Sequence, residues 1–330
     1  MLLYAAIGTA SGAASHFMPN SEYAIVVDQL CKRYGAFLAV DNVSFTVKRG
    51  DVFAFLGPNG AGKTVTVEII ETIRTPTSGK VTVLGLDVRK GKAEIVRRIG
   101  VLPQNFSSFD RITVRESLQY YARVFGFKAD VDALMDLTNL SGKADALFNT
   151  LSGGLKQRLG IAAALVNDPE VVFLDEPTTG LDPHARRQVW EVLKGLKDRG
   201  KTIFLTTHYM DEAELLADTV AIISAGKIVA IDSPARLTER NTDQTRLTLE
   251  SIDTAALGVI QKLGFVPTQN GDGNICIRVG KADDVRVILD EIKQAGLALP
   301  GLDVRKPNLE EVFLKLTSAT PDDRENAGAA

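Results

Sequence analysis

Short apolar runs alternate along much of the chain with segments in which apolar residues recur at helical spacing. The runs are rich in β-branched and aromatic residues, which is typical of strands. They cover residues 23–28, 43–47, 51–56, 80–84, 171–174 and 202–206. One predicted helix follows Gly62 and ends near Arg74, because Pro76 cannot continue it. A second runs from Asp182 to Gly200. Strands that alternate with helices indicate an α/β fold with a largely parallel, helix-covered sheet.

A helical segment interrupts this alternation. Thr113 begins the tetrapeptide TVRE, in which Glu116 can complete a capping box. Apolar residues then recur at helical spacing; they are Val114, Leu118, Tyr121 and Phe125. We therefore expect a helix from Thr113 and a helical subdomain over about residues 105–165. Further along the chain, residues 220–224 and 228–231 predict a hairpin.

The pattern changes after Ser233 and Pro234. Beyond this point we expect four strands, at residues 245–249, 265–268, 275–279 and 302–306. We also expect three helices, at residues 254–263, 281–295 and 309–316. The βαββαβ order of the first six elements indicates a small ferredoxin-like α+β domain with one extra helix. The chain thus divides into an α/β domain, residues 22–238, and a C-terminal accessory domain, residues 239–317.

The two ends of the chain carry no such pattern. Residues 1–21 lack periodicity, and we expect a disordered extension or a start codon assigned too early. Their apolar start, residues 1–14, is too short to span a bilayer and lacks the basic region of a signal peptide. Residues 318–330 are small and polar and predict a disordered tail.

Composition narrows the class of protein. Of the 330 residues, 45% are hydrophobic and 24% are charged, which excludes a disordered or collagen-like chain. Lys and Arg number 38 against 41 Asp and Glu, so the net charge of −3 recruits neither nucleic acid nor an anionic membrane. The two cysteines, Cys31 and Cys276, support neither a disulfide framework nor a metal cluster, which favours a reducing compartment.

Residues 57–64 read GPNGAGKT and follow a predicted strand directly. This is the phosphate-binding pattern GxxxxGK[ST], in which glycines let backbone N–H groups curl around phosphate oxygens at a helix N-terminus. We expect Lys63 to reach the β- and γ-phosphates and Thr64 to bind Mg²⁺. The candidate nucleotide-binding residues are Gly57, Pro58, Asn59, Gly60, Ala61, Gly62, Lys63, Thr64 and Val65. The alternative is a glycine-rich turn that binds nothing.

A second constellation lies at the end of the predicted strand VVFLDE, residues 171–176. Asp175 can hold Mg²⁺, directly or through water, and Glu176 can accept a proton from a water that attacks the γ-phosphate. Acidic residues at strand ends are common, so the pairing with the P-loop is what makes this interpretation strong. The alternative for Glu176 is a solvated loop carboxylate.

Residues 151–158, LSGGLKQR, resemble the signature motif of ATP-binding-cassette (ABC) ATPases. The resemblance, over about residues 22–238, implies a P-loop NTPase fold with a RecA-like core, an antiparallel β-subdomain and a helical subdomain. In that family two ATPase domains form a head-to-tail dimer, and the signature of one covers the nucleotide held by the other. Ser152, Gly153 and Gly154 would act there in trans. The alternative is an N-capped helix start, and both can hold.

The resemblance implies roles for five more positions. Tyr34 matches the aromatic residue that stacks on adenine, and Val40 lines the same face; the alternative for Tyr34 is a core tyrosine. Gln104 matches the glutamine that contacts Mg²⁺ and the attacking water. Asp182 matches the dimer-interface aspartate of the D-loop, and its alternative is a mere helix N-cap. His208 matches the switch histidine that contacts the γ-phosphate; the alternative is a structural histidine.

Two departures from the family pattern stand out. Val65 replaces the usual Ser or Thr, which removes one hydroxyl contact to the α-phosphate. Leu155 replaces the frequent signature glutamine, as is usual in one subgroup. The ending KPNLEEVFLKLT, residues 306–317, is similar to that of ATPases that serve ABC-2-type exporters, such as drug-resistance and nodulation-factor exporters. A generic amphipathic helix explains the same residues.

These resemblances imply an ATP-hydrolysing subunit that uses ATP and Mg²⁺ and powers transport, in the direction of export, of an unknown substrate. The implied partners are a second ATPase subunit in a homodimer and a separate ABC-2-type permease, with no nucleic acid. The implied location is the cytoplasmic face of the cell membrane, through the permease. One alternative is a non-transport ABC ATPase that acts on the ribosome or nucleic acid. Another is a regulatory module that holds ATP without turnover.

The family's permease docks beside the loop that carries Gln104. In this chain the docking groove would be lined by residues 104–111 and by the helix that Thr113 caps. Phe106 and Phe109 are large apolar residues in that loop. They either meet the permease or pin the loop to the helical subdomain.

Overall fold

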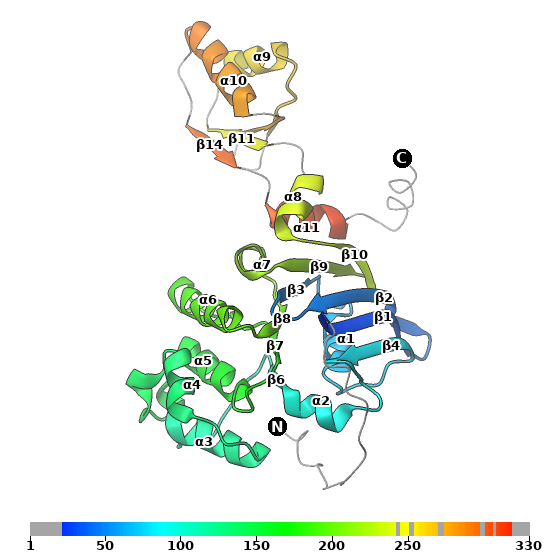
Figure 1. Ribbon diagram of the computed structural model, residues 1–330. Helices are drawn as coiled ribbons and strands as arrows, with labels where there is room; N and C mark the ends of the chain where they lie inside the picture. The colour runs from blue at the N-terminus through cyan, green and yellow to red at the C-terminus, as the bar shows by residue number, and fades with distance from the viewer. Residues whose placement is uncertain are drawn as a thin grey trace. The chain divides into compact units, whose positions relative to one another are not determined.

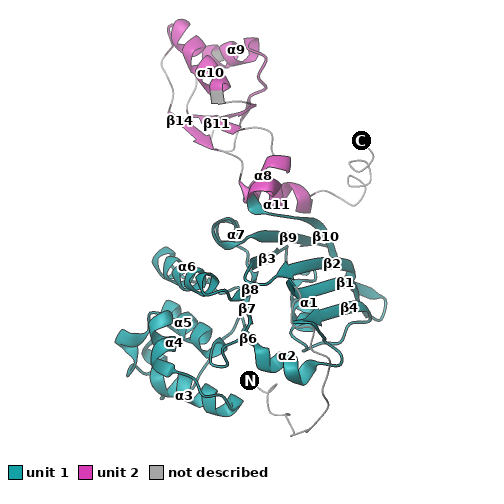
Figure 2. Cartoon of the chain, in the orientation of Figure 1, with its two compact units in different colours: residues 1–234 teal, residues 235–330 magenta. Residues whose placement is uncertain are grey.

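The computed structural model describes residues 22–241, 245–250, 254–269, 274–280, 282–297, 301–305 and 308–318. The expected extension (1–21), the expected tail beyond residue 318 and most of the predicted turn at 270–274 lie outside the described residues. The chain forms two compact units, residues 1–234 and 235–330 (Figure 2). This division and the boundary expected after residue 238 both fall within one helix, α8 (Pro234–Asn241).

A six-stranded sheet forms the centre of the first unit, in the order β10-β9-β3-β8-β7-β6. Its strands are β3 (Val52–Leu56), β6 (Ile99–Leu102), β7 (Val171–Asp175), β8 (Thr202–Thr206), β9 (Thr219–Ser224) and β10 (Lys227–Asp232). All neighbours pair in parallel except β10, which forms the predicted hairpin with β9. The largely parallel sheet is confirmed.

Alternating residues of this sheet face two different layers. One face packs against a second sheet and α1 (Lys63–Ile70), around stacked rings of Phe45, Phe53 and Phe204. The opposite face packs against α5 (Gly153–Ala164), α6 (Pro183–Asp198) and α7 (Met210–Leu216) (Figure 1). Strands buried on both faces account for the continuous apolar runs in the sequence.

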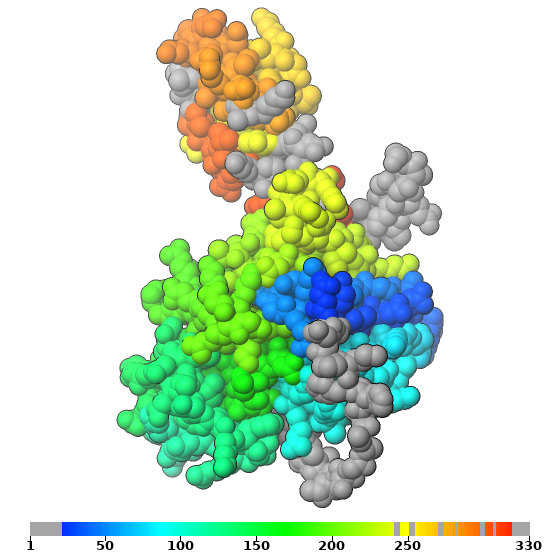
Figure 3. Space-filling view, in the orientation of Figure 1, coloured from blue at the N-terminus to red at the C-terminus, as the bar shows by residue number. Residues whose placement is uncertain are grey.

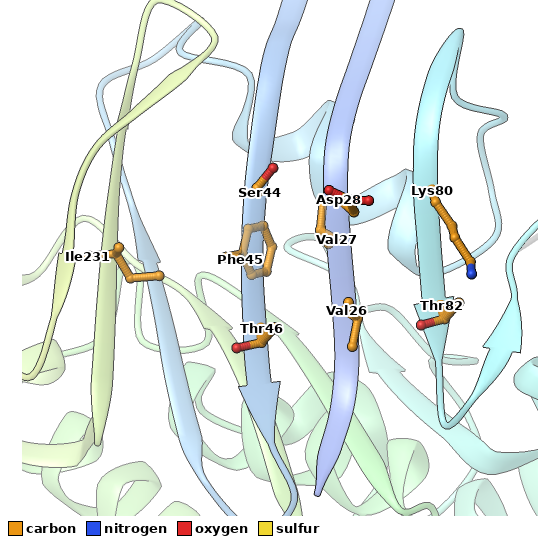
Figure 4. A pocket seen from close by; sticks show the side chains of 9 residues that line it. All are labelled: Val26, Val27, Asp28, Ser44, Phe45, Thr46, Lys80, Thr82 and Ile231. Carbon is orange, nitrogen blue, oxygen red and sulfur yellow. The ribbon is translucent and has the colours of Figure 1, made fainter. Parts of the chain in front are cut away.

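The second sheet is antiparallel, in the order β2-β1-β4-β5, with strands β1 (Tyr23–Tyr34), β2 (Phe37–Lys48), β4 (Ser78–Val83) and β5 (Leu86–Asp87). An open pocket of about 530 Å³ lies over it, where Val26, Asp28, Lys80 and Thr82 meet Ile231 (Figure 4). None of the residues that line this pocket belongs to the predicted nucleotide site, and we assign it no part in that site.

The helical subdomain contains α3 (Val114–Phe125), α4 (Val131–Leu137), α5 and two short 3₁₀ turns, Ser141–Lys143 and Phe148–Thr150. Its own core is formed by residues such as Leu118, Tyr121 and Leu159. The capping box is confirmed: Thr113 Oγ1 accepts from the backbone of Glu116, whose carboxylate accepts from the backbone of Thr113.

Several elements differ from the predictions. The helix after Gly62 ends at Ile70, because Thr72 has a left-handed backbone (φ 66°). Strand β1 extends past its apolar run into polar residues, and β2 begins earlier than predicted; Lys32 and Arg33 pair there with Val40 and Leu38. The strand predicted at 265–268 is wrong in place, since β12 is Thr268–Gln269. Helix α2 (Lys92–Arg98), β6 and α7 are too short to show a clear period, and the sequence pattern did not predict them.

The second unit holds a four-stranded antiparallel sheet in the order β12-β13-β11-β14, with β11 (Thr245–Leu249), β13 (Ile275–Val279) and β14 (Leu302–Arg305). Helices α9 (Thr254–Lys262) and α10 (Ala282–Gln294) supply Ile260, Ile288 and Ile292 to its core. The chain adds α11 (Leu309–Ser318) at the end. The βαββαβ order supports the ferredoxin-like assignment, which stays a prediction. Within the described ranges, no helix has the length and apolar character needed to cross a bilayer.

Candidate nucleotide-binding and hydrolysis site

The P-loop connects β3 to α1, as the sequence predicts. Lys63 is buried, and its Nζ donates to the carbonyl oxygens of Gly57 (2.6 Å) and Pro58 (3.1 Å). Burial lowers the pKa of Lys63, while the carboxylates of Glu176 and Asp175 oppose that shift. The negative charges of Glu176 and Asp175 therefore act on the Lys63 ammonium group.

Glycine is required where the loop packs against its neighbours. A Cβ at Gly57 would lie 2.4 Å from the carbonyl oxygen of Ile223. At Gly62 it would lie 2.5 Å from the carbonyl oxygen of Ala39, and the φ of 101° is itself unfavourable for other residues. Pro58, Asn59 and Gly60 are exposed on the other side of the loop. The loop thus rests tightly on the core and turns its exposed backbone outward.

The three residues after Lys63 differ in their burial and in what they contact. Thr64 is exposed, whereas Val65 is half-buried and packs against the core. Thr66, which the sequence interpretation did not single out, is buried and donates its hydroxyl to the carbonyl of Gly62 (2.9 Å). Its signal is a hydroxyl residue one turn after the last P-loop glycine. Thr64 is therefore the hydroxyl that remains free to meet a ligand at the surface.

Tyr34 lies at the end of β1 with 41% of its surface exposed. Its hydroxyl accepts from Arg74 Nη1 (3.0 Å), and Lys32 Nζ lies 5.0 Å from the ring centroid. The ring is thus oriented by two cations and remains partly exposed. Val40 lies elsewhere: it is fully buried, behind Gly62, and its contact with a base stays a prediction.

The two acidic residues of the second constellation are positioned by β8. Asp175 ends β7 and pairs with Thr206 across the sheet, and Thr206 Oγ1 donates to Asp175 Oδ1 (2.5 Å). The backbone N–H of Glu176 donates to both the carbonyl and the hydroxyl of Thr206 (3.1 Å each). Glu176 itself has a left-handed backbone, with φ 49°, so the chain turns sharply after Asp175. Thr206 is a positioning residue that sequence reasoning missed.

Three side chains meet on the carboxylate of Glu176, which is largely buried. Gln104 Nε2 donates to Oε2 (2.9 Å), and the Thr179 hydroxyl donates to the same oxygen (3.2 Å). His208 Nε2 contacts Oε1. The structure thus brings together Gln104, Glu176 and His208, which the sequence names from three separate segments.

A buried carboxyl lies behind this site. Glu71 follows α1 and is 7% exposed. Burial raises its pKa to about 8, and the nearby charges of Asp175 and Glu68 add to that shift. Sequence reasoning did not find Glu71, because an acidic residue in a predicted helix is normally placed on the exposed face.

The candidate trans-acting residues lie together elsewhere in the unit. Ser152 caps α5, Asp182 caps α6, and each accepts from the backbone N–H three residues on. A Cβ at Gly154 would lie 2.7 Å from the Cβ of Ala185, so the two helix starts are in close contact. Helices α1 and α5 pack on opposite faces of the six-stranded sheet (Figure 1). The signature is therefore not placed over the P-loop of its own chain.

Comparisons with known proteins identify the family of this chain. The ABC transporter family matches residues 40–179. Nod factor export ATP-binding protein I of Rhizobium meliloti (strain 1021) is 40% identical over 309 residues, which cover 91% of this chain and 90% of that protein.

Two solved structures share the fold. CbiO1 of Clostridium perfringens, part of the ABC transporter complex CbiONQ, is 26% identical with a TM-score of 0.61, over 74% of this chain and 97% of that one. A dimeric bacterial ABC transporter cassette is 25% identical with a TM-score of 0.56, over 63% of this chain and 98% of that one. The chain belongs to the ABC transporter family, as an ATP-binding and ATP-hydrolysing subunit.

Proposed function

We propose that this chain powers export of a substrate through a separate ABC-2-type permease, as one of two ATPase subunits at the cytoplasmic face of the membrane. The convergence of Gln104, Glu176 and His208 beside the P-loop lysine carries the proposal, because it is an arrangement for hydrolysis and not for storage of ATP. The similarity to Nod factor export ATP-binding protein I supports export.

The residues that would hold Mg²⁺ fit that ion. Thr64, Gln104 and Asp175 offer a hydroxyl, an amide and a carboxylate oxygen, and Mg²⁺ prefers such oxygen ligands together with substrate phosphates and water. Within the described ranges no group of three or more His, Cys, Asp or Glu is placed to hold a metal ion. When bound, the ion would neutralise charge on the β- and γ-phosphates.

Hydrolysis follows from the position of Glu176. Its carboxylate accepts a proton from a water molecule, the water oxygen forms a bond to the γ-phosphorus, and the bond from that phosphorus to the bridging oxygen of ADP breaks. Gln104 and His208 hold the two carboxylate oxygens, so the base is oriented before substrate binds. Lys63, which now donates to its own loop, would donate to the β- and γ-phosphates.

The second subunit supplies the signature. Ser152, Gly153 and Asp182 lie on contacting helix starts, away from the P-loop of the same chain. Exposed N–H groups at the start of α5 form an anion site, which a phosphate from another subunit can occupy. A head-to-tail homodimer would bring two such sites and two P-loops together.

The two phenylalanines of the predicted permease surface differ in their exposure. Phe106 is half-buried, packs against Tyr121 and Phe148, and leaves no room for a Cβ at Gly160. Phe109 is 43% exposed and meets Tyr120 edge-on, with ring centroids 5.1 Å apart. We therefore assign docking to Phe109 and Tyr120, and assign to Phe106 the role of holding the loop in place.

The test is reconstitution with candidate ABC-2-type permeases from the source organism of this chain. We expect one of them to co-purify with this chain and, in lipid vesicles, to stimulate ATP hydrolysis by this chain. Absence of both effects, with ATPase activity intact in the isolated chain, would favour a non-transport ABC ATPase. Absence of hydrolysis altogether would favour a regulatory ATP-binding module.

A further inference from the structure

Glu212, in α7, is a buried carboxylate that joins three elements. It is 0% exposed, and its Oε1 accepts from the Thr178 hydroxyl (3.0 Å) and from Trp190 Nε1 (2.9 Å). Thr178 lies between Glu176 and the D-loop, Trp190 lies in α6, and α7 begins two residues after His208. One oxygen atom therefore connects the segment that follows Glu176 to α6 and to the helix that follows His208.

A second set of contacts spans the same junction. The guanidinium carbon of Arg186, in α6, lies 3.8 Å from the ring centroid of Tyr209, the residue after His208. Arg186 Nη1 also lies 3.7 Å from Asp211 Oδ2, and its backbone N–H donates to the carbonyl of Asp182. The helix that begins at the D-loop aspartate is thus fastened to the segment that carries the switch histidine.

The packing of α7 does not explain a carboxyl group in this position. Burial raises the pKa of Glu212, because the charged form is removed from water. Hydrogen bonds with Thr207, Trp190 and Thr178 oppose that shift. Replacing Glu212 alone by an apolar residue would leave the Thr178 hydroxyl and Trp190 Nε1 without their acceptor, which is unfavourable for buried donors. Ala213 and Leu216 already bury the apolar side of α7. The carboxylate therefore fixes an orientation and adds little to the packing.

We propose that Glu212 is a positioning residue for hydrolysis, which couples the D-loop, through Thr178 and Trp190, to the position of His208 on Glu176. Movement of the D-loop against a second subunit would then move the histidine that holds the catalytic carboxylate. The proposal rests on the roles proposed above for His208 and Asp182, and it extends them to a connection inside each subunit.

The kinetic test uses the full chain and Glu212→Met, which keeps the volume and removes the acceptor. We expect kcat to fall by about tenfold or more, with the KM for ATP unchanged, because a small misplacement of a catalytic group has effects of this size. Glu212→Gln keeps an acceptor oxygen and should restore most of kcat. Leu215→Met, an exposed position on the same helix, is the matched control. A Glu212→Met enzyme with wild-type kcat overturns the proposal.

Thr178→Val removes the hydroxyl that donates to Glu212 and tests the same connection from the D-loop side. We expect it to lower kcat, and the double variant Thr178→Val/Glu212→Met to be no slower than Glu212→Met alone, because both substitutions break one connection. Effects that multiply would show that the two residues act separately and would contradict the proposal. If Glu212→Met fails to fold, Thr178→Val and Trp190→Phe carry the test, since each removes one donor.

Trp190 is the single tryptophan of the chain, so its fluorescence reports on this cluster directly. In a Glu176→Gln background, ATP and Mg²⁺ should shift the Trp190 emission, and Glu212→Met should abolish that shift while Leu215→Met keeps it. A shift that survives Glu212→Met contradicts the coupling. His208→Ala separates the two claims: if it leaves kcat unchanged, the proposed role of His208 fails, whatever the result at Glu212.

Discussion

Gln104 donates a hydrogen bond of 2.9 Å to the carboxylate of Glu176. Gln104 belongs to the loop between β6 and α3, and α3 opens the helical subdomain. The loop that leads into the helical subdomain therefore touches Glu176, the proposed base, within a single subunit. Movement of this loop by a docked partner would have a direct route to the proposed chemistry, because the bond to Gln104 holds one oxygen of Glu176.

The two phenylalanines of this loop should respond differently to substitution. Phe109→Asp should leave the melting temperature and basal ATPase activity of the isolated chain nearly unchanged, because the side chain is 43% exposed. Co-purification with the permease should be lost. Phe106→Asp is the contrast, and it should lower the melting temperature by placing a charge among packed rings. Early melting of Phe109→Asp would place Phe109 in the core and remove the docking assignment.

Tyr34→Ala should weaken ATP binding by about 1–3 kcal/mol, the range for stacking of a base on an aromatic ring. The measurement is a titration of ATP by calorimetry. Phe37→Ala is the control, because Phe37 is 64% exposed at the start of the next strand. An unchanged dissociation constant for Tyr34→Ala would show that the ring only accepts the hydrogen bond from Arg74.

The buried carboxyl group of Glu71 makes the free energy of unfolding depend on pH. Its pKa is about 8 in the folded chain, against an ordinary value of 4.5, so between these pH values the folded state holds a proton that the unfolded state has lost. Stability contributed by this group is complete below pH 4.5 and falls as pH rises, by about 1.4 kcal/mol per pH unit at most. It levels off above pH 8.

Glu71→Gln removes that titration, and at pH 7 the variant should exceed the wild type in unfolding free energy by about 3 kcal/mol at most. The difference should vanish near pH 4.5. Urea unfolding at both pH values measures it, with Glu191→Gln, at an exposed position in α6, as the comparison. Equal pH slopes in wild type and Glu71→Gln would show that Glu71 is ionised in the folded chain.

A mixing experiment tests whether each site is built from two subunits. Ser152→Asp keeps a helix cap but places a negative charge where the phosphate of the other subunit would lie, and Ser152→Asn is its neutral control. Lys63→Ala removes the P-loop amine. Ser152→Asp alone and Lys63→Ala alone should each be inactive. A mixture should regain turnover, since a heterodimer holds one site with both an intact P-loop and an intact signature. A mixture as inactive as its components would contradict sites built in trans.

The sequence predicted the local elements that carry the candidate site better than the contacts between them. The P-loop, the strand that ends at Asp175 and the cap at Thr113 have short local patterns, and the structure confirms each of these elements. The contacts that orient Glu176 could not be predicted from the sequence, because Gln104, Thr206 and His208 approach it from other strands and loops. Glu71 and Glu212 were missed for a related reason: only packing shows that an acidic residue on a helix is buried.

The central claim, hydrolysis by a base at Glu176 in a dimer that closes on ATP, is tested most directly by Glu176→Gln. This change removes the carboxylate and keeps its size, and the amide can still accept from Gln104. Sizing by light scattering, with and without ATP and Mg²⁺, is compared with steady-state phosphate release. We predict that the variant binds ATP, releases no phosphate above background and accumulates as a stable dimer. Phosphate release at the wild-type rate, with no ATP-dependent dimer, would contradict the account.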